Sequence, residues 1–334
     1  MNILVVSGGS GGHINPAIKL IKSISEHRIV YIGTNTRIEK ENIPKLNISY
    51  YLLNNKGLKK GLNNKLIFIY YLIINIFKII KIIKKEKIDK IITFGGYSAS
   101  SVFLANLFLK KDIYMHEQNV IIGRNNKLML RFANKIFTSF KNTKGIKDKY
   151  LNKVVYSGNP SFFETKKIDN NNFNILIMTG SLGSSSVSEK LLPLLEDYPS
   201  ITMIGGINNK LSHKCIIPYV NNMEEFLPNF DLVITRAGAS SLNEISSLGI
   251  PSIIIPSPYV INNHQYLNAK EYLSIKRGYL IKENEIDINV IKNIINELKN
   301  NKFLYEEISK NSKTFYNINA IKIIKKEMGL WKDS

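Results

Sequence analysis

Short runs of apolar, mostly β-branched residues alternate along this chain with segments whose apolar positions recur at helical spacing. In the first half the runs are typical of buried strands and occupy residues 3–6, 29–33, 88–94, 112–115, 136–139 and 154–157. The second half repeats the pattern at residues 175–178, 201–205, 215–220, 232–235 and 251–255. Strands that alternate with helices predict parallel sheets covered on both faces. We therefore expect an α/β protein with two Rossmann-like, doubly wound domains that face each other across a cleft.

Turn-forming residues mark a junction near the middle of the chain. Gly158, Asn159 and Pro160 follow the last apolar run of the first half, and Gly and Pro interrupt regular structure. We therefore predict a first domain over 1–158 and a second domain that begins at 159. A lysine-rich segment of helical spacing covers residues 286–328.

Two glycine-rich turns each follow a predicted strand and precede a predicted helix. Ser7–Gly12 contains four glycines, and Gly180–Ser186 combines glycine with serine. The free N–H groups and the dipole at a helix start favour an anion, so both turns are candidate phosphate or pyrophosphate sites. An ordinary strand-to-helix turn is the alternative. The spacing is not G-x-G-x-x-G and no acidic residue closes the next strand, so a dinucleotide fingerprint is unsupported.

Polar side chains follow two further strands of the first half. His13 stands where the first helix begins, as a base or donor that faces the cleft, or as a capping or solvent-facing histidine. His116–Asn119 is a run of four polar residues after the strand at 112–115. The carboxyl ends of strands line the ligand crevice in open α/β sheets, which favours a functional role for this run.

The second half carries candidates for binding a nucleotide sugar. Arg236 follows a strand and, with the Gly180–Ser186 turn, could stabilise a leaving pyrophosphate. Glu244 lies on the next helix, where its carboxylate could accept two hydrogen bonds from a ribose diol, or could be a helix-surface residue. Gln265 and Asn268 share one helix face and could hold sugar hydroxyls, or could end a solvated helix. Together these residues predict a nucleotide-sugar site in the second domain and an acceptor site in the first.

Composition narrows the class of protein. The chain has 334 residues and a formal net charge of +20, which favours an anionic partner, although Ile, Asn and Lys are used heavily throughout, as an AT-rich coding sequence would give. The single cysteine, Cys215, excludes an intrachain disulfide and is typical of a reducing compartment. The amino terminus leads directly into a strand, so we expect no signal peptide. The sequence has neither a DxD motif in its central region nor a Cys/His cluster, so we predict no metal and no cofactor.

Residues 62–87 have an unusual distribution of side chains. An unbroken apolar run extends from Leu66 to Ile74, and lysines then recur on a helical rhythm. The unbroken run is too short to span a bilayer, which takes about 20 residues. An amphipathic helix of this kind is typical of a bilayer surface, and a buried helix with a basic outer edge is the alternative.

Several motifs occur in the order found in one known family. They are Gly8-Gly9-Ser10-Gly11-Gly12-His13, Gly95-Gly96-Tyr97, His116-Glu117-Gln118-Asn119, Gly158-Asn159-Pro160, Gly180-Ser181-Leu182-Gly183, Arg236-Ala237-Gly238-Ala239 and His264-Gln265 with Asn268-Ala269. In this order the chain resembles the MurG family of glycosyltransferases (family 28), along almost its whole length. The glycine-rich histidine loop and the His-Glu-Gln-Asn run are specific only in combination.

The resemblance implies a GT-B fold and an inverting transfer of N-acetylglucosamine (GlcNAc). The donor would be UDP-GlcNAc, and the acceptor the C4 hydroxyl of the N-acetylmuramoyl (MurNAc) unit of lipid I, the undecaprenyl-diphosphate-linked MurNAc-peptide. The product would be lipid II for peptidoglycan. The resemblance also implies a peripheral enzyme on the cytoplasmic side of the cell membrane, with residues 62–87 as the segment that contacts acidic lipids. The second domain would end at 311, and 312–334 would return to the first domain as a helix.

The resemblance also implies roles for single residues. Ser181 would contact the phosphates, the backbone near Met223 the uracil, and Glu244 the ribose. The GlcNAc would be surrounded by Asn119, Ala239, Gln265 and His264. Ser10 and His13 would lie near the reacting centre, with the glycines of that loop, Gly11 and Gly12, at the acceptor's diphosphate. A base must take the proton of the attacking hydroxyl, and the first candidate is His13, followed by Glu117 and His116.

The sequence departs from the family pattern at two places. Thr179 stands where the family usually has a glycine before the Gly-Ser-Leu-Gly turn. Ser161-Phe162-Phe163 stand where the family usually carries an arginine after Gly-Asn-Pro, so a nucleotide contact must be lost or supplied elsewhere.

Three other functions remain open at this point. They are a different GT-B glycolipid transferase, a UDP-GlcNAc 2-epimerase of the same fold, and a non-enzymatic membrane- or nucleic-acid-binding protein. We expect no nucleic-acid partner, because the sequence has no groove pattern of interleaved basic and aromatic residues.

Overall fold

The chain forms two compact units. The computed structural model describes residues 1–54, 62–169, 172–180, 183–206 and 211–331. The first unit comprises Met1–Pro160 with Ile318–Ser334, and the second comprises Ser161–Asn317. The chain therefore returns to the first unit at Ile318 rather than at the expected residue 312.

The first unit is built on a parallel sheet. Among the described residues its strand order is β3-β2-β1-β4-β5-β6-β7. The strands are β1 (Asn2–Val6), β2 (Arg28–Thr34), β3 (Ser49–Leu53), β4 (Lys90–Thr93), β5 (Asp112–Glu117), β6 (Lys135–Thr138) and β7 (Val154–Tyr156). The α-helices are α1 (Gly11–Ser23), α2 (Arg37–Asn42), α3 (Leu62–Lys85), α4 (Tyr97–Leu109), α5 (Arg124–Met129) and α12 (Ala320–Glu327).

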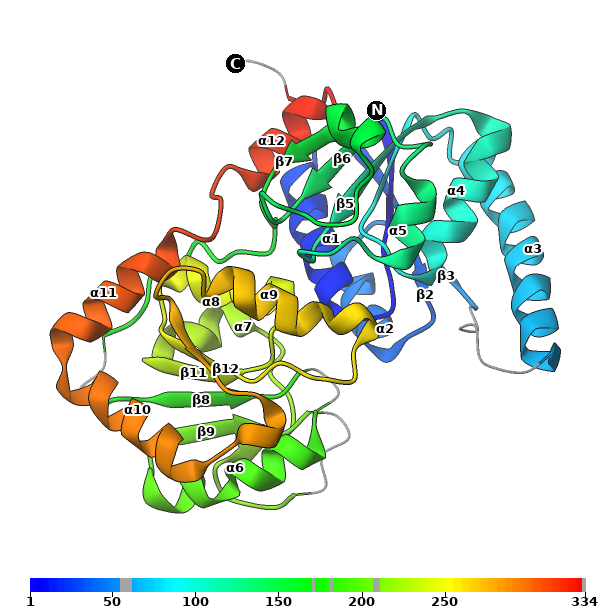
Figure 1. Cartoon of the computed structure of the whole chain (residues 1–334). Helices are drawn as coiled ribbons and strands as arrows, with labels where there is room; N and C mark the ends of the chain where they lie inside the picture. The colour runs from blue at the N-terminus through cyan, green and yellow to red at the C-terminus, as the bar shows by residue number, and fades with distance from the viewer. Residues whose placement is uncertain (55–61, 170–171, 181–182, 207–210, 332–334) are drawn as a thin grey trace. The chain divides into compact units, whose positions relative to one another are not determined.

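Helices cover both faces of this sheet because its central strands are apolar on both sides. In β1, Leu4 and Val6 pack into one core with α3 and α4, whereas Ile3 and Val5 pack into another with α1 and α12. Figure 1 shows α3 and α4 side by side on one side of the unit. Side chains alternate between the two faces of a strand, so a continuous apolar run fills two cores.

The second unit repeats this plan. Among its described residues the sheet has the parallel order β10-β9-β8-β11-β12-β13. The strands are β8 (Ile175–Met178), β9 (Ile201–Ile204), β10 (Ile216–Ile217), β11 (Leu232–Thr235), β12 (Ser252–Ile254) and β13 (Gly278–Leu280). The α-helices are α6 (Ser185–Asp197), α7 (Met223–Phe226), α8 (Ala239–Leu248), α9 (His264–Tyr272), α10 (Ile288–Asn300) and α11 (Lys302–Lys313). Five short 3-10 helices complete the described chain, η1 (Pro44–Leu46), η2 (Asp148–Lys153), η3 (Leu227–Asn229), η4 (Ile261–Asn263) and η5 (Glu283–Glu285).

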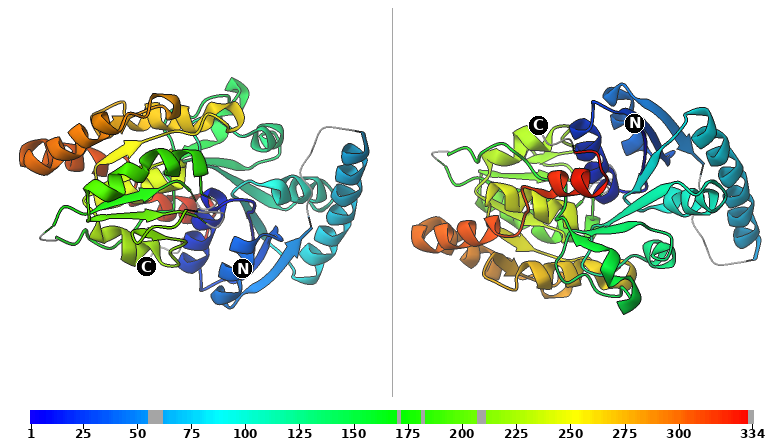
Figure 2. Two further views of the ribbon diagram at one scale, coloured as in Figure 1. Left: turned by 90° about the horizontal axis from the view of Figure 1, so that it is seen from below. Right: turned by 90° about the horizontal axis from the view of Figure 1, so that it is seen from above.

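The last helix is tied to the first unit by lysines and a carboxylate. Lys325 donates to the carbonyl of Ser23 at 2.8 Å, and Lys90 donates to the carbonyl of Met328 at 2.7 Å. Lys135 pairs with Glu327 at 3.3 Å. Both views of Figure 2 place α12 beside α1. This contact explains why the end of the chain belongs with its beginning.

Four details differ from the sequence prediction. The edge strands β3 and β13 are partly exposed and were not predicted. The expected strand at 215–220 shrinks to Ile216–Ile217, because Pro218 has no N–H for the ladder. The first helix starts at Gly11, since the Ser10 carbonyl already accepts the amides of His13 and Ile14. Pro16 therefore lies inside α1.

Candidate active site

In the first unit, loops at the carboxyl ends of β1, β4 and β5 pack against one another. A Cβ atom on Gly96 would lie only 2.3 Å from the carbonyl oxygen of Gly8, so the two glycine loops touch backbone to backbone. Gly96 also has φ of +88°, which side chains disfavour. A Cβ on Gly95 would lie 3.3 Å from the ring of His13. Motifs that are far apart in the sequence therefore meet in one compact site.

The start of α1 has the features of an anion site. Ser10 is its exposed N-cap residue, Gly11 and Gly12 are its first two residues, and its first turn contains no acidic residue. The Gly9 amide is instead directed to the hydroxyl of Thr34 at 3.1 Å, which fixes the loop. A helix start of this kind favours a phosphate group. Contact of Ser10, Gly11 and Gly12 with a substrate stays a prediction.

His13 is connected to the polar run at the end of β5. Its Nδ1 lies 2.9 Å from Oε1 of Gln118. The amide nitrogen of Gln118 lies 3.0 Å from Nδ1 of His116, whose Nε2 lies 3.0 Å from the carbonyl oxygen of Gly158. His13 is half-buried, whereas His116 and Gln118 are buried. Of the three residues named as candidate bases, only His13 is therefore not buried.

Glu117 is saturated with hydrogen bonds inside the loop that follows β5. Its carboxylate accepts the amides of Asn119 at 3.0 Å and Gly123 at 2.8 Å, and the side-chain nitrogen of Asn126 at 2.8 Å. The residue is 1% exposed. The Asn119 side chain also donates to this carboxylate, at 3.3 Å. This geometry favours a positioning role for Glu117 over the predicted role of base.

The burial of His116 predicts acid-sensitive stability. Desolvation lowers the pKa of His116 to about 4, despite the opposing hydrogen bond to Gly158 and with a small contribution from His13. The unfolded chain would bind a proton near pH 6.5, but the folded chain would not until about pH 4. This stabilisation is complete above pH 6.5 and is lost as the pH falls toward 4, by about 3 kcal/mol in total. Urea unfolding at several pH values should give a flatter dependence for His116→Gln than for the wild type, and parallel curves would contradict the assignment.

In the second unit, Thr179 organises the turn between β8 and α6. Its buried hydroxyl accepts the amide of Ser184, the N-cap residue of α6, at 3.1 Å and lies 3.4 Å from the hydroxyl of Ser188. The residue that departs from the family pattern thus satisfies one amide at the start of the helix. Gly183 also packs closely, since a Cβ there would lie 2.2 Å from the carbonyl oxygen of Gly205. Ser181, predicted to contact the phosphates, lies outside the described residues.

Removing the Thr179 hydroxyl should loosen this turn. We expect Thr179→Val to lower the free energy of unfolding by about 1 kcal/mol, because it leaves the Ser184 amide without its acceptor. Thr179→Ser keeps the hydroxyl and serves as the matched control. Urea unfolding would measure both, and a valine variant as stable as the wild type would exclude this role.

Arg236 is buried and makes several contacts within the second unit. It forms an ion pair with Glu283 at 2.7 Å and donates to the hydroxyl of Ser184 at 2.7 Å and to the carbonyl of Ile255 at 3.1 Å. Burial opposes the charge of Glu283, but hydrogen bonds from Ser186 and Arg236 keep the pKa of this carboxyl below its ordinary value. Arg236 therefore joins three loop regions at the carboxyl end of the sheet. Its predicted contact with a pyrophosphate would have to be made from this position.

Glu244 is held by the segment that departs from the family pattern. It lies on α8, which begins at Ala239, and its carboxylate accepts a hydrogen bond from the hydroxyl of Ser161. The side chain of Asn243 donates to the Ser161 carbonyl at 2.8 Å. Ser161 thereby orients the carboxylate that is predicted to bind the ribose. Contact of Ala239 or Glu244 with a nucleotide stays a prediction.

The start of α9 positions the remaining candidates. Gln265 accepts the amide of Ser257 at 2.9 Å through its carbonyl, and its amide nitrogen has no partner among the described residues. Asn268 is fully buried and donates to the carbonyl of Ala237 at 3.2 Å, which favours a positioning role. His264 donates from Nδ1 to the carbonyl of Ile261 at 2.9 Å. Met223, the first residue of α7, is half-buried against the apolar core beneath α8.

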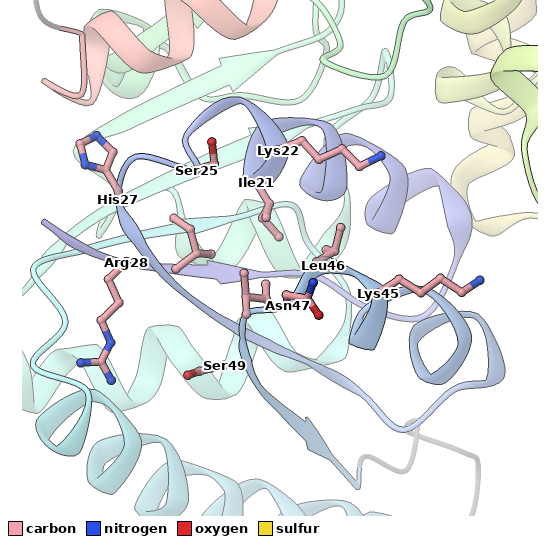
Figure 3. Close-up of a pocket in the computed structure, with 11 residues that line it drawn as sticks. Ile21, Lys22, Ser25, His27, Arg28, Lys45, Leu46, Asn47 and Ser49 are labelled. Atoms are coloured by element: carbon pink, nitrogen blue, oxygen red, sulfur yellow. The ribbon is translucent and has the colours of Figure 1, made fainter.

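Two surface cavities lie at different ends of their sheets. In the second unit a cavity of about 760 Å³ is lined by Ser186, Tyr266 and Glu283, among others, and so adjoins the Arg236 ion pair. In the first unit a cavity of about 550 Å³ is lined by His27 and Arg28, which open strand β2, and by Lys45. Figure 3 shows the cavity of the first unit, which lies at the amino ends of the strands, opposite the glycine loops. Within the described residues, no group of three or more His, Cys, Asp or Glu side chains could hold a metal ion.

Comparison with known proteins identifies the family. Residues 3–138 match the glycosyltransferase family 28 N-terminal domain, and residues 147–322 match the family 28 C-terminal domain. The chain belongs to glycosyltransferase family 28. A relative from Pediococcus pentosaceus is 33% identical, with 89% of this chain and 90% of the relative covered. One from Caldicellulosiruptor saccharolyticus is 32% identical, with 94% and 93% covered. Both are named UDP-N-acetylglucosamine--N-acetylmuramyl-(pentapeptide) pyrophosphoryl-undecaprenol N-acetylglucosamine transferase.

Solved structures support the family 28 fold. Acinetobacter baumannii MurG superposes with a TM-score of 0.75 at 22% identity, with 99% of each chain covered. A UDP-GlcNAc 2-epimerase from Neisseria meningitidis gives 0.67 at 15% identity, with 98% of this chain and 99% of that chain covered. The predicted GT-B class with two doubly wound units is therefore confirmed. Because an epimerase shares the fold, the fold alone does not choose between transfer and epimerisation, whereas the sequence family does.

Sequence reasoning named most of the polar residues described above but missed their partners. Gln118 was seen only as part of a polar run, although its amide joins two histidines. Glu283 and Ser184 were not considered as partners of Arg236. A buried polar residue needs a hydrogen-bond partner, which was the available signal for Gln118, but its identity requires the tertiary structure.

Proposed function

We propose that this chain transfers GlcNAc from UDP-GlcNAc to the C4 hydroxyl of the MurNAc unit of lipid I, which yields lipid II for peptidoglycan. The observation that carries this proposal is identity of about a third, along nearly the full chain, to transferases of that name. Two further features support it. The first unit has a helix start without acidic residues at α1, and the second has Arg236 paired with Glu283 and Glu244 held by Ser161.

The proposed reaction is a single displacement at C1 of GlcNAc. The acceptor oxygen attacks from the face opposite UDP, the bond from C1 to the UDP oxygen breaks, and the configuration inverts. His13 takes the proton of the attacking hydroxyl as general base. The start of α6, ordered by Thr179 and Arg236, stabilises the charge that develops on the leaving diphosphate. Glu244, oriented by Ser161, accepts the ribose hydroxyls.

An acceptor assay separates this function from its rivals. The purified full chain would be incubated with labelled UDP-GlcNAc and lipid I, with diacylglycerol, or with no acceptor. We expect labelled product only when lipid I is the acceptor. We also expect the rate of transfer to be the same with and without a chelator, because protein groups hold the diphosphate in this mechanism. A diacylglycerol product would indicate another glycolipid transferase. Conversion of UDP-GlcNAc without an acceptor would indicate the 2-epimerase.

Helix α3 supports a location on the membrane surface. Leu66–Lys85 is long and apolar enough to cross a bilayer. The sequence alone had excluded a span, because only the shorter unbroken run, Leu66 to Ile74, was considered. Ile79 and Ile83, however, are buried in the core of the first unit, so this half of the helix cannot enter a bilayer. Ile67 is also exposed, and the other exposed large apolar residues described on this helix form one stripe at helical spacing, Leu66, Ile69, Tyr70, Ile73 and Phe77.

The stripe continues into basic residues along the same helix. Lys81, Lys84 and Lys85 are exposed beyond Phe77. Helices that bind an anionic bilayer surface typically insert apolar side chains into the bilayer, while neighbouring lysines contact the lipid phosphates. Figure 2 shows α3 at the outer edge of the first unit, beside α4. We propose that this stripe holds the enzyme at the membrane that contains its lipid acceptor, on the cytoplasmic side.

Polar substitution of the stripe should weaken membrane binding. We expect the double variant Tyr70→Ser, Phe77→Ser to bind phosphatidylglycerol vesicles at least about tenfold more weakly, because two large side chains no longer leave water. Phe303→Ser removes an aromatic that is 80% exposed on α11 and is the matched control. Vesicle sedimentation measures both, and an equal loss in the control would contradict this surface.

A further inference from the structure

The hydrogen bonds around His116 can be assigned from one fixed acceptor. The carbonyl oxygen of Gly158 has no proton to give, so the Nε2 of His116, 3.0 Å away, must carry one and donate it. His116 is 0% exposed, and its burial opposes a second proton on the ring. Its Nδ1 is therefore an acceptor.

This assignment fixes the orientation of Gln118. The side-chain nitrogen lies 3.0 Å from the accepting Nδ1 of His116 and 3.2 Å from the carbonyl oxygen of His116. Both neighbours accept, so the NH2 end must face them. The flipped amide would place its oxygen against a carbonyl oxygen and would require a charged, fully buried His116. The Gln118 oxygen therefore points to His13.

The orientation of Gln118 in turn fixes the proton of His13. Its Nδ1 lies 2.9 Å from an amide oxygen that can only accept, so Nδ1 carries the proton in the neutral ring. The Nε2 atom is left with its lone pair. The His13 ring also packs against Gly95, whose φ is +91°. This packing limits rotation of the ring.

We propose that His116 and Gln118 are positioning residues that hold His13 in the Nδ1–H tautomer, so that Nε2 is the atom that accepts the proton. This inference rests on the proposed function, in which His13 is the base. When Nε2 takes the proton of the sugar hydroxyl, Nδ1 keeps its own proton and its bond to Gln118, and the positive charge spreads over the ring. No proton moves through Gln118, and His116 stays neutral throughout. The proton leaves Nε2 to solvent after transfer.

The proposal predicts a specific state of one ring, independent of turnover. In protein labelled with ¹⁵N-histidine, long-range ¹H–¹⁵N spectra distinguish a protonated nitrogen from one with a lone pair. The chain has five histidines, and the signals missing from His13→Ala identify those of His13. We expect the neutral His13 ring of the free enzyme to have Nδ1–H and a lone pair on Nε2. The opposite tautomer in the wild type would overturn the proposal.

Variants of Gln118 test the cause of this state. Gln118→Leu removes the acceptor, and we expect His13 to shift toward Nε2–H and kcat to fall about 10²-fold or more, with KM for UDP-GlcNAc within about twofold. Gln118→Glu retains an acceptor and should preserve the Nδ1–H tautomer. If Gln118→Leu leaves the tautomer of His13 unchanged while its melting temperature is that of the wild type, Gln118 does not set it.

The two proposals fail in different ways. If lipid I is not glycosylated by the wild type but the predicted tautomer is observed, the proposed function is wrong and the hydrogen-bond assignment stands. If lipid I is glycosylated but His13 has Nε2–H, the function stands and the positioning role of Gln118 and His116 is wrong.

Discussion

His13→Ala is expected to lower kcat for GlcNAc transfer by about 10²- to 10⁴-fold, the range that a positioned general base contributes. The reason is that, of the three candidate bases, only His13 is not buried. Glu117 and His116 are buried, and their polar atoms are engaged by the loop and by Gly158. Steady-state rates with lipid I at saturating UDP-GlcNAc measure the effect.

The same variant should leave donor binding intact. The groups proposed to bind UDP-GlcNAc through its nucleotide belong to the second unit, so calorimetry should give a dissociation constant within about twofold of the wild type. The matched control is His27→Ala, since His27 lies at the amino end of β2, beside the cavity of Figure 3. Near-normal transfer by His13→Ala would remove His13 as the base.

Glu117→Leu is expected to lower the free energy of unfolding by about 3 kcal/mol or more, because the backbone amides of Asn119 and Gly123 and the side chain of Asn126 all lose their acceptor. The loop after β5 would then lose its order together with Asn119. Transfer should fall as a consequence of this disorder. Urea unfolding followed by circular dichroism measures the free energy.

A matched glutamate separates this effect from a general loss of charge. Glu41 lies in the same unit and is half-exposed in an ion pair with Arg37 on α2, so Glu41→Leu should cost no more than about 1 kcal/mol. If Glu117→Leu kept the stability of the wild type but lost all transfer, the positioning role of Glu117 would be wrong. Glu117 would then act in the chemistry.

In the structure, both departures from the family pattern supply a hydroxyl that forms a hydrogen bond. Thr179 supplies a hydroxyl that satisfies an amide at the start of α6. Ser161 supplies a hydroxyl to the carboxylate of Glu244. A glycine at position 179 would have no hydroxyl to accept this amide, and an arginine in the segment 161–163 could only donate. The sequence located these positions, but the partner of each is distant in sequence or belongs to another element.

The sequence by itself determined the class of fold and the ends of the strands where the site lies. Apolar runs such as Ile3–Val6 and Ile175–Met178 predict buried parallel strands, because they must fill a core on both faces. Edge strands such as β3 were missed, since a half-exposed strand has no such run. The glycine turns were also local signals, because only glycine permits the close contact of Gly8 with Gly96.

Only the tertiary structure decided what each polar side chain does. His13 and, after it, Glu117 were both candidate bases in the sequence, yet Glu117 is enclosed by donors whereas His13 has one nitrogen held by Gln118. The difference depends on contacts such as that between His13 and Gln118, which are 105 residues apart in sequence. Local propensity fixes where a strand ends, whereas the protonation and accessibility of a side chain depend on neighbours that only the folded chain brings together.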